Sequence, residues 1–293
     1  MEHRHEPVLL AEVLEALAVK RGGVYVDGTV GLAGHATAIL ERNAPDGRLL
    51  AVDRDAESLA LTRQRLAFAG QRVRFAHADF REVPALLAAE RADGILLDLG
   101  ISSAQLDDPG RGFSFRNDGP LDMRMDRTQG VSATEIVNRW PEHELADLIF
   151  RFGEERGSRR IARAIVTARR QARITSTTQL ADIVRRAARA PRGGDIDPAT
   201  RTFQALRICV NGELEQLGAA VTALARCLVP GGRIVVISFH SLEDREVKHA
   251  FAALAREELR LVTRKPLRAT PAELQANPRC RSARLRVAER SAA

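Results

Sequence analysis

The stretch Gly23-Val-Tyr-Val-Asp-Gly-Thr-Val-Gly-Leu-Ala-Gly-His35 decides the fold of this chain. A short apolar strand, Val24 to Val26, leads into a glycine-rich turn, and a helical pattern follows. Gly28, Gly31 and Gly34 allow positive φ and close approach of a ligand, and the N–H groups that open the helix suit a polar or anionic group. Because the spacing differs from the dinucleotide pattern G-x-G-x-x-G, a plain strand-to-helix turn remains an alternative.

A second apolar strand, Arg48 to Val52, ends at Asp53. This carboxylate lies about 20 residues beyond the turn, where it can accept hydrogen bonds from both hydroxyls of a ribose. The turn and the carboxylate together predict a nucleoside cofactor.

Strands and helices alternate as far as Asp98. Further strands are expected at Val73 to Ala76 and at Gly94 to Asp98. The expected helices are Leu9 to Leu17, Ala36 to Arg42, Ala56 to Ala69 and Val83 to Ala89. This alternation predicts a doubly wound α/β sheet of the Rossmann-like class, with ligands at the carboxyl ends of the strands. The residues at such ends are Gly31, Asp53, Asp79, Phe80 and Asp98.

The alternation stops after Asp98, and the next segment has only helical periodicity. Helices are expected at Ala133 to Asn138, Glu142 to Phe150, Ser158 to Arg170, Thr178 to Ala188 and Pro198 to Cys209. Residues 104–213 are therefore predicted to form an inserted helical domain for substrate recognition. The α/β domain is then discontinuous, 1–103 and 214–293. Its second part is expected to contain a helix at Glu213 to Leu228, a strand at Arg233 to Ser238, a helix at Leu242 to Ala255, and strands near Leu261 and at Leu285 to Ala288.

The composition is that of a soluble globular protein, with 45% apolar and 28% charged residues among 293. No apolar run approaches the roughly 20 residues that cross a bilayer, and the N-terminus lacks a signal-type segment, so we expect a cytoplasmic protein without membrane contact. Cys209, Cys227 and Cys280 fit neither a disulfide framework nor a zinc spacing, and no metal is expected. A net charge of +7 favours a nucleic-acid partner, with modest weight because the chain is generally rich in arginine.

Polar side chains gather after two of the strands. Asp98-Leu-Gly-Ile-Ser-Ser103, followed by Gln105, places a carboxylate, two hydroxyls and an amide at the end of a central strand. The alternative is that Asp98 or a serine only caps the following turn. In Ser238-Phe-His-Ser-Leu-Glu-Asp244, His240 can bind substrate or carry a proton. Ser241 with Asp244 fits a helix capping box equally well.

A long loop begins with Arg111-Gly-Phe-Ser-Phe115 and is dense in glycine, arginine and aspartate. Such a loop can close over a flipped base, with Phe113 or Phe115 stacking on it and Arg111 holding a phosphate. The alternative is an ordinary long loop that buries Met123 and Met125.

Near the C-terminus, Asn277-Pro-Arg-Cys-Arg-Ser-Ala-Arg-Leu-Arg286 combines four arginines with a turn signal. A solvated charged face is one interpretation. Contact with RNA phosphates fits better, with Asn277, Arg279 and Arg281 as the expected contact residues.

Taken in order, these motifs resemble the bacterial 16S rRNA cytosine-N4 methyltransferases, the family called RsmH or MraW. The likeness covers nearly the whole chain and rests on His5 to Leu10, Asp27 to His35, Asp53 to Asp55, Asp98 to Asp107, Arg111 to Phe115, Leu121 to Met125, Phe152 to Glu155, Phe203 to Ile208, Ser238 to Asp244 and Asn277 to Arg279. It implies an enzyme dependent on S-adenosyl-L-methionine (SAM), with a Rossmann-like sheet and an inserted helical domain. The implied substrate is a decoding-centre cytidine of 16S rRNA in the small ribosomal subunit.

The resemblance also implies which residues contact the cofactor. They are Ala33, Gly34, His35, Asp53, Phe80, Asp98 and Gln105. Two positions depart from the family pattern, because Ala33 replaces the usual glycine and Cys280 the usual serine. A methyl group at residue 33 restricts the backbone, so we expect φ below zero or a small shift of the turn there.

Cytosine N4 is a poor nucleophile because its lone pair is delocalised into the ring. An acceptor bonded to its N–H, and a fixed carboxylate near the sulfonium, would assist transfer. We expect Asp98, Ser102 and Ser103 to orient donor and base, with His240 on the substrate side. General amino-methyltransferases have Asp/Asn/Ser-Pro-Pro-aromatic after the fourth strand, which this chain lacks, so the acceptor is left open.

Two other functions are compatible with parts of the sequence. A nicotinamide-dependent oxidoreductase would share the turn and Asp53, and a non-enzymatic RNA-binding assembly factor would account for the arginines. The number of copies that associate is also left open, with a homodimer as one candidate.

Overall fold

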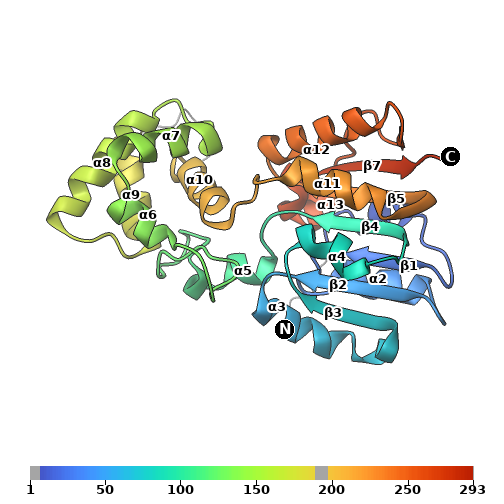
Figure 1. The fold of residues 1–293 in the computed structure, drawn as a ribbon. Coiled ribbons are helices and arrows are strands. Elements are labelled where there is room, and N and C mark those ends of the chain that lie inside the picture. Colours follow the sequence, from blue (N-terminus) through green and yellow to red (C-terminus); the bar gives the residue numbers. More distant parts are fainter. Residues whose placement is uncertain (1–6, 189–196, 293) are drawn as a thin grey trace. The chain divides into compact units, whose positions relative to one another are not determined.

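The structure is a computed structural model that describes residues 7–188 and 197–292 (Figure 1). His5 and Glu6, from the first motif of the resemblance, lie outside the described residues. The chain divides into two compact units, a sheet unit of residues 1–100 and 214–293 and a helical unit of residues 101–213. The first junction follows Gly100, whereas the sequence placed it after residue 103. Within the described ranges, no helix combines the length and apolar character needed to cross a membrane.

The described part of the sheet unit contains a seven-stranded sheet in the order β3-β2-β1-β4-β5-β7-β6. The strands are β1 (Val24–Asp27), β2 (Arg48–Asp53), β3 (Val73–His77), β4 (Ala92–Asp98), β5 (Leu228–Ser238), β6 (Leu259–Leu261) and β7 (Arg284–Arg290). Neighbours from β3 through to β5 are parallel, and β7 runs antiparallel to both β5 and β6. The expected strands are confirmed, and the carboxyl ends of β1, β2, β4 and β5 lie along one edge.

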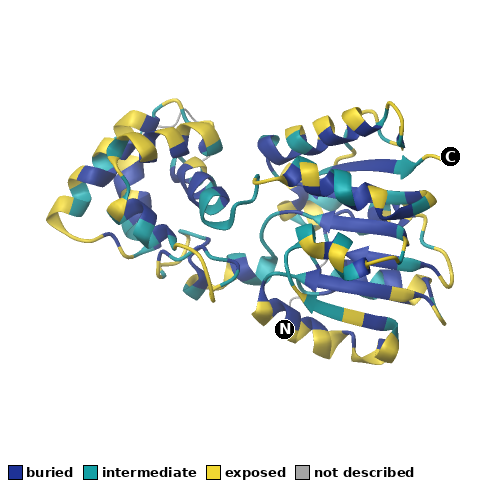
Figure 2. Cartoon of the chain, viewed as in Figure 1, coloured by how far each residue is buried: buried dark blue, intermediate teal, exposed yellow. Residues whose placement is uncertain are grey.

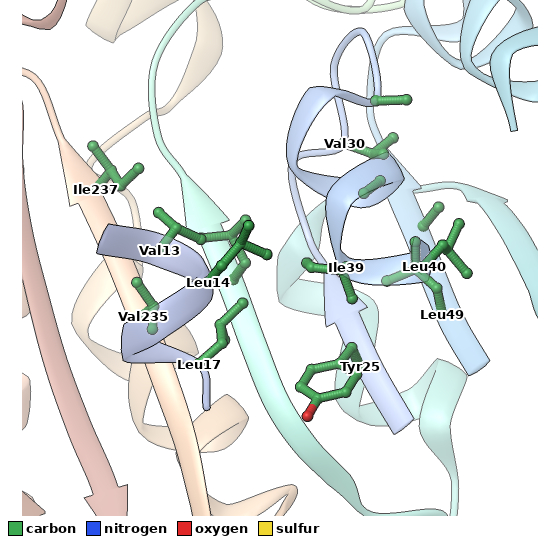
Figure 3. Close-up of a cluster of buried hydrophobic side chains, with 14 of the residues drawn as sticks. Val13, Leu14, Leu17, Tyr25, Val30, Ile39, Leu40, Leu49, Val235 and Ile237 are labelled. Carbon is green, nitrogen blue, oxygen red and sulfur yellow. The ribbon is translucent and has the colours of Figure 1, made fainter. Parts of the chain in front are cut away.

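Alternate residues of the strands enter two separate cores, so the sheet is buried on both faces (Figure 2). On one face, Tyr25 and Leu49 pack against side chains of the first helices (Figure 3). These helices are α1 (Leu10–Ala16), α2 (Gly34–Arg42) and α3 (Ala56–Arg65). On the other face, Val26 and Leu50 pack against α4 (Val83–Leu87), α11 (Leu217–Arg226) and α12 (Ser241–Leu254). The alternation explains the continuous apolar runs of these strands.

The strand β5 begins earlier than the sequence indicated. A Pro-Gly-Gly sequence suggested a start at Arg233, yet β5 begins at Leu228. The register with β4 shifts between the pairs Ala92–Leu228 and Gly94–Arg233, and Gly231 has φ of 79°. The turn residues therefore form a bulge inside the strand and do not end it.

The helical unit contains the five expected helices and a core of its own. They are α6 (Ala133–Arg139), α7 (Glu142–Gly153), α8 (Ser158–Gln171), α9 (Thr177–Ala187) and α10 (Ala199–Asn211). Ile136, Leu145, Ile161, Leu180 and Leu206 pack in this core. In the sheet unit, the expected helix Ala56 to Ala69 divides into α3 and η1 (Ala67–Arg72). Short elements that were not expected occur in both units, and they are η2 (Phe80–Glu82), α5 (Ser103–Asp107), η3 (Pro109–Arg111), α13 (Pro271–Ala276) and η4 (Pro278–Ser282).

Candidate active site

The glycine turn after β1 depends on close packing more than on positive φ. Of its three expected glycines, Gly31 has positive φ, at 50°. A Cβ on Gly28 would lie 2.6 Å from Cδ2 of Leu97, and one on Gly34 would lie 2.4 Å from Cγ of Pro7. A larger residue at either position would press on these neighbouring side chains, so the space available favours glycine there.

Ala33 adopts the left-handed conformation, with φ 66° and ψ 18°, so the expectation of φ below zero was wrong. Its N–H donates to the carbonyl of Val30 at 2.8 Å, and its carbonyl accepts from the N–H and the Oγ1 of Thr37 at 2.9 and 2.8 Å. These bonds and complete burial hold a conformation that costs an L-residue roughly 1–2 kcal/mol. As the residue that precedes α2, Ala33 provides no side-chain cap.

A buried carboxylate, Asp27, ends β1, and a half-buried one, Asp53, ends β2. Asp27 is 1% exposed and accepts from the N–H of Thr29 at 3.1 Å. Burial raises the pKa of Asp27 to about 7, although the nearby His35 opposes the shift. Asp53 accepts from the N–H groups of Gly31 and Asp55 at 2.7 and 2.8 Å, and burial raises its pKa as well.

At the end of β4, the side chains of His35 and Asp98 lie close together and include polar atoms without hydrogen-bond partners among the described residues. His35 Nε2 lies 3.6 Å from Asp98 Oδ2. Both ring nitrogens of His35 and Oδ1 of Asp98 are buried with no hydrogen-bond partner among the described residues. The N–H of Asp98 donates to Thr29 Oγ1 at 2.6 Å, which fixes the end of β4 against the glycine turn. Unpaired buried polar atoms are costly, so this geometry indicates a polar ligand.

Phe80 lies against the same turn. Its Cβ is 3.1 Å from the position that a Cβ of Gly28 would occupy. The preceding Asp79 accepts hydrogen bonds from Arg81 and lies 3.4 Å from Arg54. Although burial alone would raise it, the hydrogen bonds from Arg81 hold the pKa of Asp79 below its ordinary value. Phe80 is therefore held on a rigid turn at the end of β3.

His240 lies at the end of β5 and caps α12. Its Nδ1 accepts from the N–H of Glu243 at 3.3 Å, while the Glu243 carboxylate accepts from the N–H groups of Phe239 and His240 at 2.9 and 3.4 Å. The expected capping pair of Ser241 and Asp244 was wrong, because the pair is shifted by one residue. Since Nδ1 is an acceptor, the ring proton is on Nε2, which lies 3.2 Å from Glu243 Oε1.

The remaining polar candidates near Asp98 in sequence belong to the helical unit. Ser102 Oγ accepts from the N–H of Gln105 at 3.2 Å, and Gln105 Oε1 accepts from the N–H of Ser102 at 2.9 Å. Ser102 therefore caps the following turn, and its expected part in orienting donor and base stays a prediction. Ser103 is the first residue of α5 and is partly exposed.

The long loop places two of its three expected RNA contacts inside the helical unit. The guanidinium of Arg111 donates to the carbonyls of Arg124 and Met125 at 3.2 and 2.9 Å, and Phe113 is 7% exposed. Because both side chains are buried, a phosphate clamp by Arg111 and base stacking on Phe113 have no support in this geometry. Phe115 is partly exposed, and its ring lies 5.4 Å from the guanidinium carbon of Arg185.

The C-terminal motif is a tight turn with exposed arginines. Asn277 Oδ1 accepts from the N–H of Arg279 at 3.2 Å, and the Asn277 carbonyl accepts from Cys280 Sγ at 2.8 Å. Cys280 is buried, and burial raises the pKa of its thiol. Arg279 and Arg281 are exposed. Asn277 therefore shapes the turn, and the two arginines lie at the surface.

Sequence reasoning missed Asp27 and Thr29 as individual site residues. Asp27 directly follows an apolar strand, as Asp53 and Asp98 do, and this pattern was the available signal. Thr29 gave no signal, because its bond to Asp98 joins the turn after β1 to the end of β4, and these segments are far apart in the sequence.

The fold and the site together define the class of protein to which this chain belongs. A dinucleotide fold has parallel strands in the order 3-2-1-4-5-6, whereas here β7 is inserted antiparallel between β5 and β6. This arrangement, with a glycine turn and a ribose-type carboxylate at one edge, is that of the Rossmann-like SAM-dependent methyltransferases. The chain belongs to the MraW methylase family, whose model matches residues 2–291. It is an enzyme that uses SAM, and neither the oxidoreductase nor the non-enzymatic alternative applies.

Curated relatives match along the whole chain. Ribosomal RNA small subunit methyltransferase H of Sorangium cellulosum is 52% identical over 98% of this chain and 91% of its own length. The protein of the same name from Geobacter sp. is 50% identical, with 99% of each chain covered. The solved structure of PH0851 has a TM-score of 0.52 at 14% identity, covers 98% of this chain and 46% of that one, and supports the fold alone.

The residues at the sheet edge fit SAM, which supplies an electrophilic methyl group on a sulfonium. Each oxygen of Asp53 accepts one backbone bond, so lone pairs remain for ribose hydroxyls. Phe80 offers an apolar surface beside the turn. Oδ1 of Asp98 and the ring nitrogens of His35 are buried there without a hydrogen-bond partner among the described residues.

Proposed function

We propose that this protein transfers a methyl group from SAM to N4 of a decoding-centre cytidine of 16S rRNA in the small ribosomal subunit. The curated relatives, matched end to end, are named as small-subunit rRNA methyltransferases. The observation that carries the chemistry is the buried, unpartnered Oδ1 of Asp98 at the end of β4. It is an acceptor held ready for a donor such as the N4 amine.

In this proposal, Asp98 accepts a hydrogen bond from N4 and so helps localise the nitrogen lone pair. Its negative charge offsets the positive charge that develops on N4 as the methyl group leaves the sulfonium. The excess proton on N4 then passes to the carboxylate and on to water. Thr29 Oγ1, which accepts from the N–H of Asp98, fixes the backbone from which this carboxylate extends.

The cofactor contacts of the proposal follow the sheet edge. Asp53 binds the ribose, Phe80 packs on the adenine, and the turn residues Ala33, Gly34 and His35 contact the methionine part. Gln105, which closes a capping box with Ser102, is proposed as a further contact from the helical unit.

On the substrate side, the helical unit is proposed to recognise RNA. Phe115 is its partly exposed aromatic candidate. Ser103, the first residue of α5, is partly exposed and is not the residue that caps the helix. His240 is proposed as a positioning residue because its ring is engaged with Glu243. Arg279 and Arg281 are proposed to contact phosphates.

The test uses radiolabelled SAM and small ribosomal subunits from a strain that lacks the activity, followed by mapping of the labelled nucleotide. We expect label on N4 of one 16S cytidine. Binding of SAM without transfer would contradict the proposed substrate, and failure to bind SAM would contradict the cofactor site.

Asp98→Ala should abolish this transfer, because the carboxylate acts on the reacting nitrogen. Loss of such a group typically costs about 10²–10³-fold in kcat or more. The variant should keep the circular dichroism spectrum and thermal transition of the parent. A folded Asp98→Ala protein with normal turnover would contradict the assigned role.

A further inference from the structure

Residues 263–284 of the sheet unit carry positive charge that the fold leaves unneutralised. This segment contains five arginines and one lysine but a single acid, Glu273. Five of the cations are exposed, and we call them the tail surface; they are Arg264, Lys265, Arg268, Arg279 and Arg281. Within the described residues, Arg264, Lys265, Arg268 and Arg281 have no acidic partner.

Two other exposed arginines of the same unit are paired with acids. Arg226 lies 2.8 Å from Glu258, and Arg260 lies 2.7 Å from Glu289. Unpaired charges of one sign repel one another, and a polyanion would relieve that repulsion. The tail surface therefore has the charge expected of a site for an anionic partner.

The pairing of β7 places this surface at the edge that holds the cofactor residues. Arg284 pairs with Ser238, the last residue of β5, so the chain that precedes β7 lies beside the carboxyl end of β5. Asp98, at the end of β4, pairs with Ile237 of the same strand. Leu267 and Leu285 exchange two backbone hydrogen bonds of 2.9 Å, which brings the row 264–268 beside the start of β7.

The backbone that carries these cations is anchored near the cofactor turn. Oε1 of Glu273, in α13, accepts from the N–H of Leu9 at 2.6 Å. Pro7, on the same N-terminal segment, lies against Gly34. Leu274 and Cys280 pack into the adjoining core. The exposed cations are thus presented from a fixed segment and not from a free loop.

We infer that the tail surface binds the phosphate backbone of RNA next to the nucleotide that is methylated. The inference rests on the proposed function and adds a second row, Arg264, Lys265 and Arg268, to the Arg279 and Arg281 expected from the sequence. Guanidinium groups bind phosphate oxygens in pairs, and a lysine contributes a point charge. The sheet unit then holds its substrate with contacts of its own.

The test compares two full-length variants that each lose three exposed cations. The first is Arg264→Gln/Lys265→Gln/Arg268→Gln. The matched control is Arg42→Gln/Arg91→Gln/Arg256→Gln, at the opposite edge of the same unit, since these residues end α2, precede β4 and follow α12. Binding to 16S rRNA transcribed in vitro is measured over a series of salt concentrations, and SAM affinity is measured alongside.

The tail variant should bind this rRNA roughly tenfold more weakly or worse. Its plot of log affinity against log salt concentration should be less steep by about two, because each lost phosphate contact reduces the steepness by about 0.7–0.9. The control should match the parent in slope, and both variants should bind SAM normally. An unchanged slope overturns the inference. So does slower methylation of assembled subunits with unchanged rRNA binding, which would assign the surface to an acidic protein. If the parent methylates no 16S cytidine and the tail variant still shows the flatter slope, the RNA contact stands and the proposed function falls.

Discussion

At the scale of single residues, the site contains groups held in conformations or charge states that they would not adopt alone. Ala33 is left-handed, Asp27 is a buried carboxylate, and Oδ1 of Asp98 has no hydrogen-bond partner in the part of the chain that the structure describes. Backbone strain and unpaired polar groups reduce stability, and they persist only where many surrounding contacts hold them in place. Their gathering at one sheet edge is what distinguishes a ligand site from a tight turn.

Substitutions at Ala33 should separate backbone strain from packing. Ala33→Gly removes a left-handed penalty of roughly 1–2 kcal/mol but loses a buried methyl group and gains entropy in the unfolded chain, so stability should change by less than about 1 kcal/mol. Ala33→Val, which is β-branched, should cost about 2 kcal/mol or more. Urea unfolding of both variants measures the difference. Equal stability of the Gly and Val variants would contradict the left-handed assignment.

Asp27 should make stability depend on pH in the absence of SAM. Its pKa is about 7 in the folded protein, above the ordinary value of 3.8, so the folded state holds the proton more tightly than the unfolded state. The contribution of Asp27 is complete below pH 4 and is lost as the pH rises to about 7, with a slope approaching about 1.4 kcal/mol per pH unit. Asp27→Asn should lose this slope and be more stable than the parent at pH 8. Parallel stability curves for the two proteins from pH 4 to 8 would show that the carboxylate is not buried.

At the scale of elements, capping bonds at the N-termini of two helices hold several candidate site residues in fixed positions. α5 begins with the pair Ser102 and Gln105, and α12 begins with the pair His240 and Glu243. Each pair satisfies N–H groups that a helix end leaves open. A polar residue at a strand end can therefore serve the fold and the site together.

His240→Asn should distinguish capping from direct catalysis. Asparagine is among the best N-cap residues, so the variant should keep stability within about 1 kcal/mol, whereas His240→Ala should lose about 1 kcal/mol. Because the histidine ring is engaged with Glu243, we expect His240→Asn to keep kcat within tenfold of the parent. Thermal unfolding and methyl transfer are measured on both variants. A stable Asn variant with a hundredfold lower kcat would instead place His240 in the chemistry.

At the scale of the whole molecule, each hydrophobic core that the structure describes lies within one of the two units. The two cores of the sheet unit contain buried residues from that unit alone, and the core of the helical unit is equally self-contained. A unit with its own core is expected to fold by itself.

Replacing residues 101–213 by a flexible glycine-serine linker should therefore leave a folded sheet unit. It should bind SAM, more weakly if Gln105 contributes, and transfer no methyl group to rRNA. Calorimetric titration with SAM and near-ultraviolet circular dichroism measure the two properties. A shortened protein that binds SAM as the parent does would remove Gln105 from the cofactor site, and an unfolded one would contradict the independence of the cores.

Sequence alone determined the order of the elements and the residues that end the strands. Asp53 and Asp98 were found because apolar runs and turn residues are local signals, read within a few positions. The family resemblance rested on the same kind of signal and was confirmed by the match over residues 2–291.

Only the tertiary structure decided how those residues are held. Burial of Arg111 and Phe113, the left-handed Ala33 and the unpaired Asp98 oxygen depend on contacts with segments that are distant in sequence. The antiparallel insertion of β7, which brings a basic C-terminal segment to the cofactor edge, is likewise a matter of strand pairing. Neighbours along the chain specify local conformation, whereas burial and the pairing of polar atoms are set by what packs against them from elsewhere.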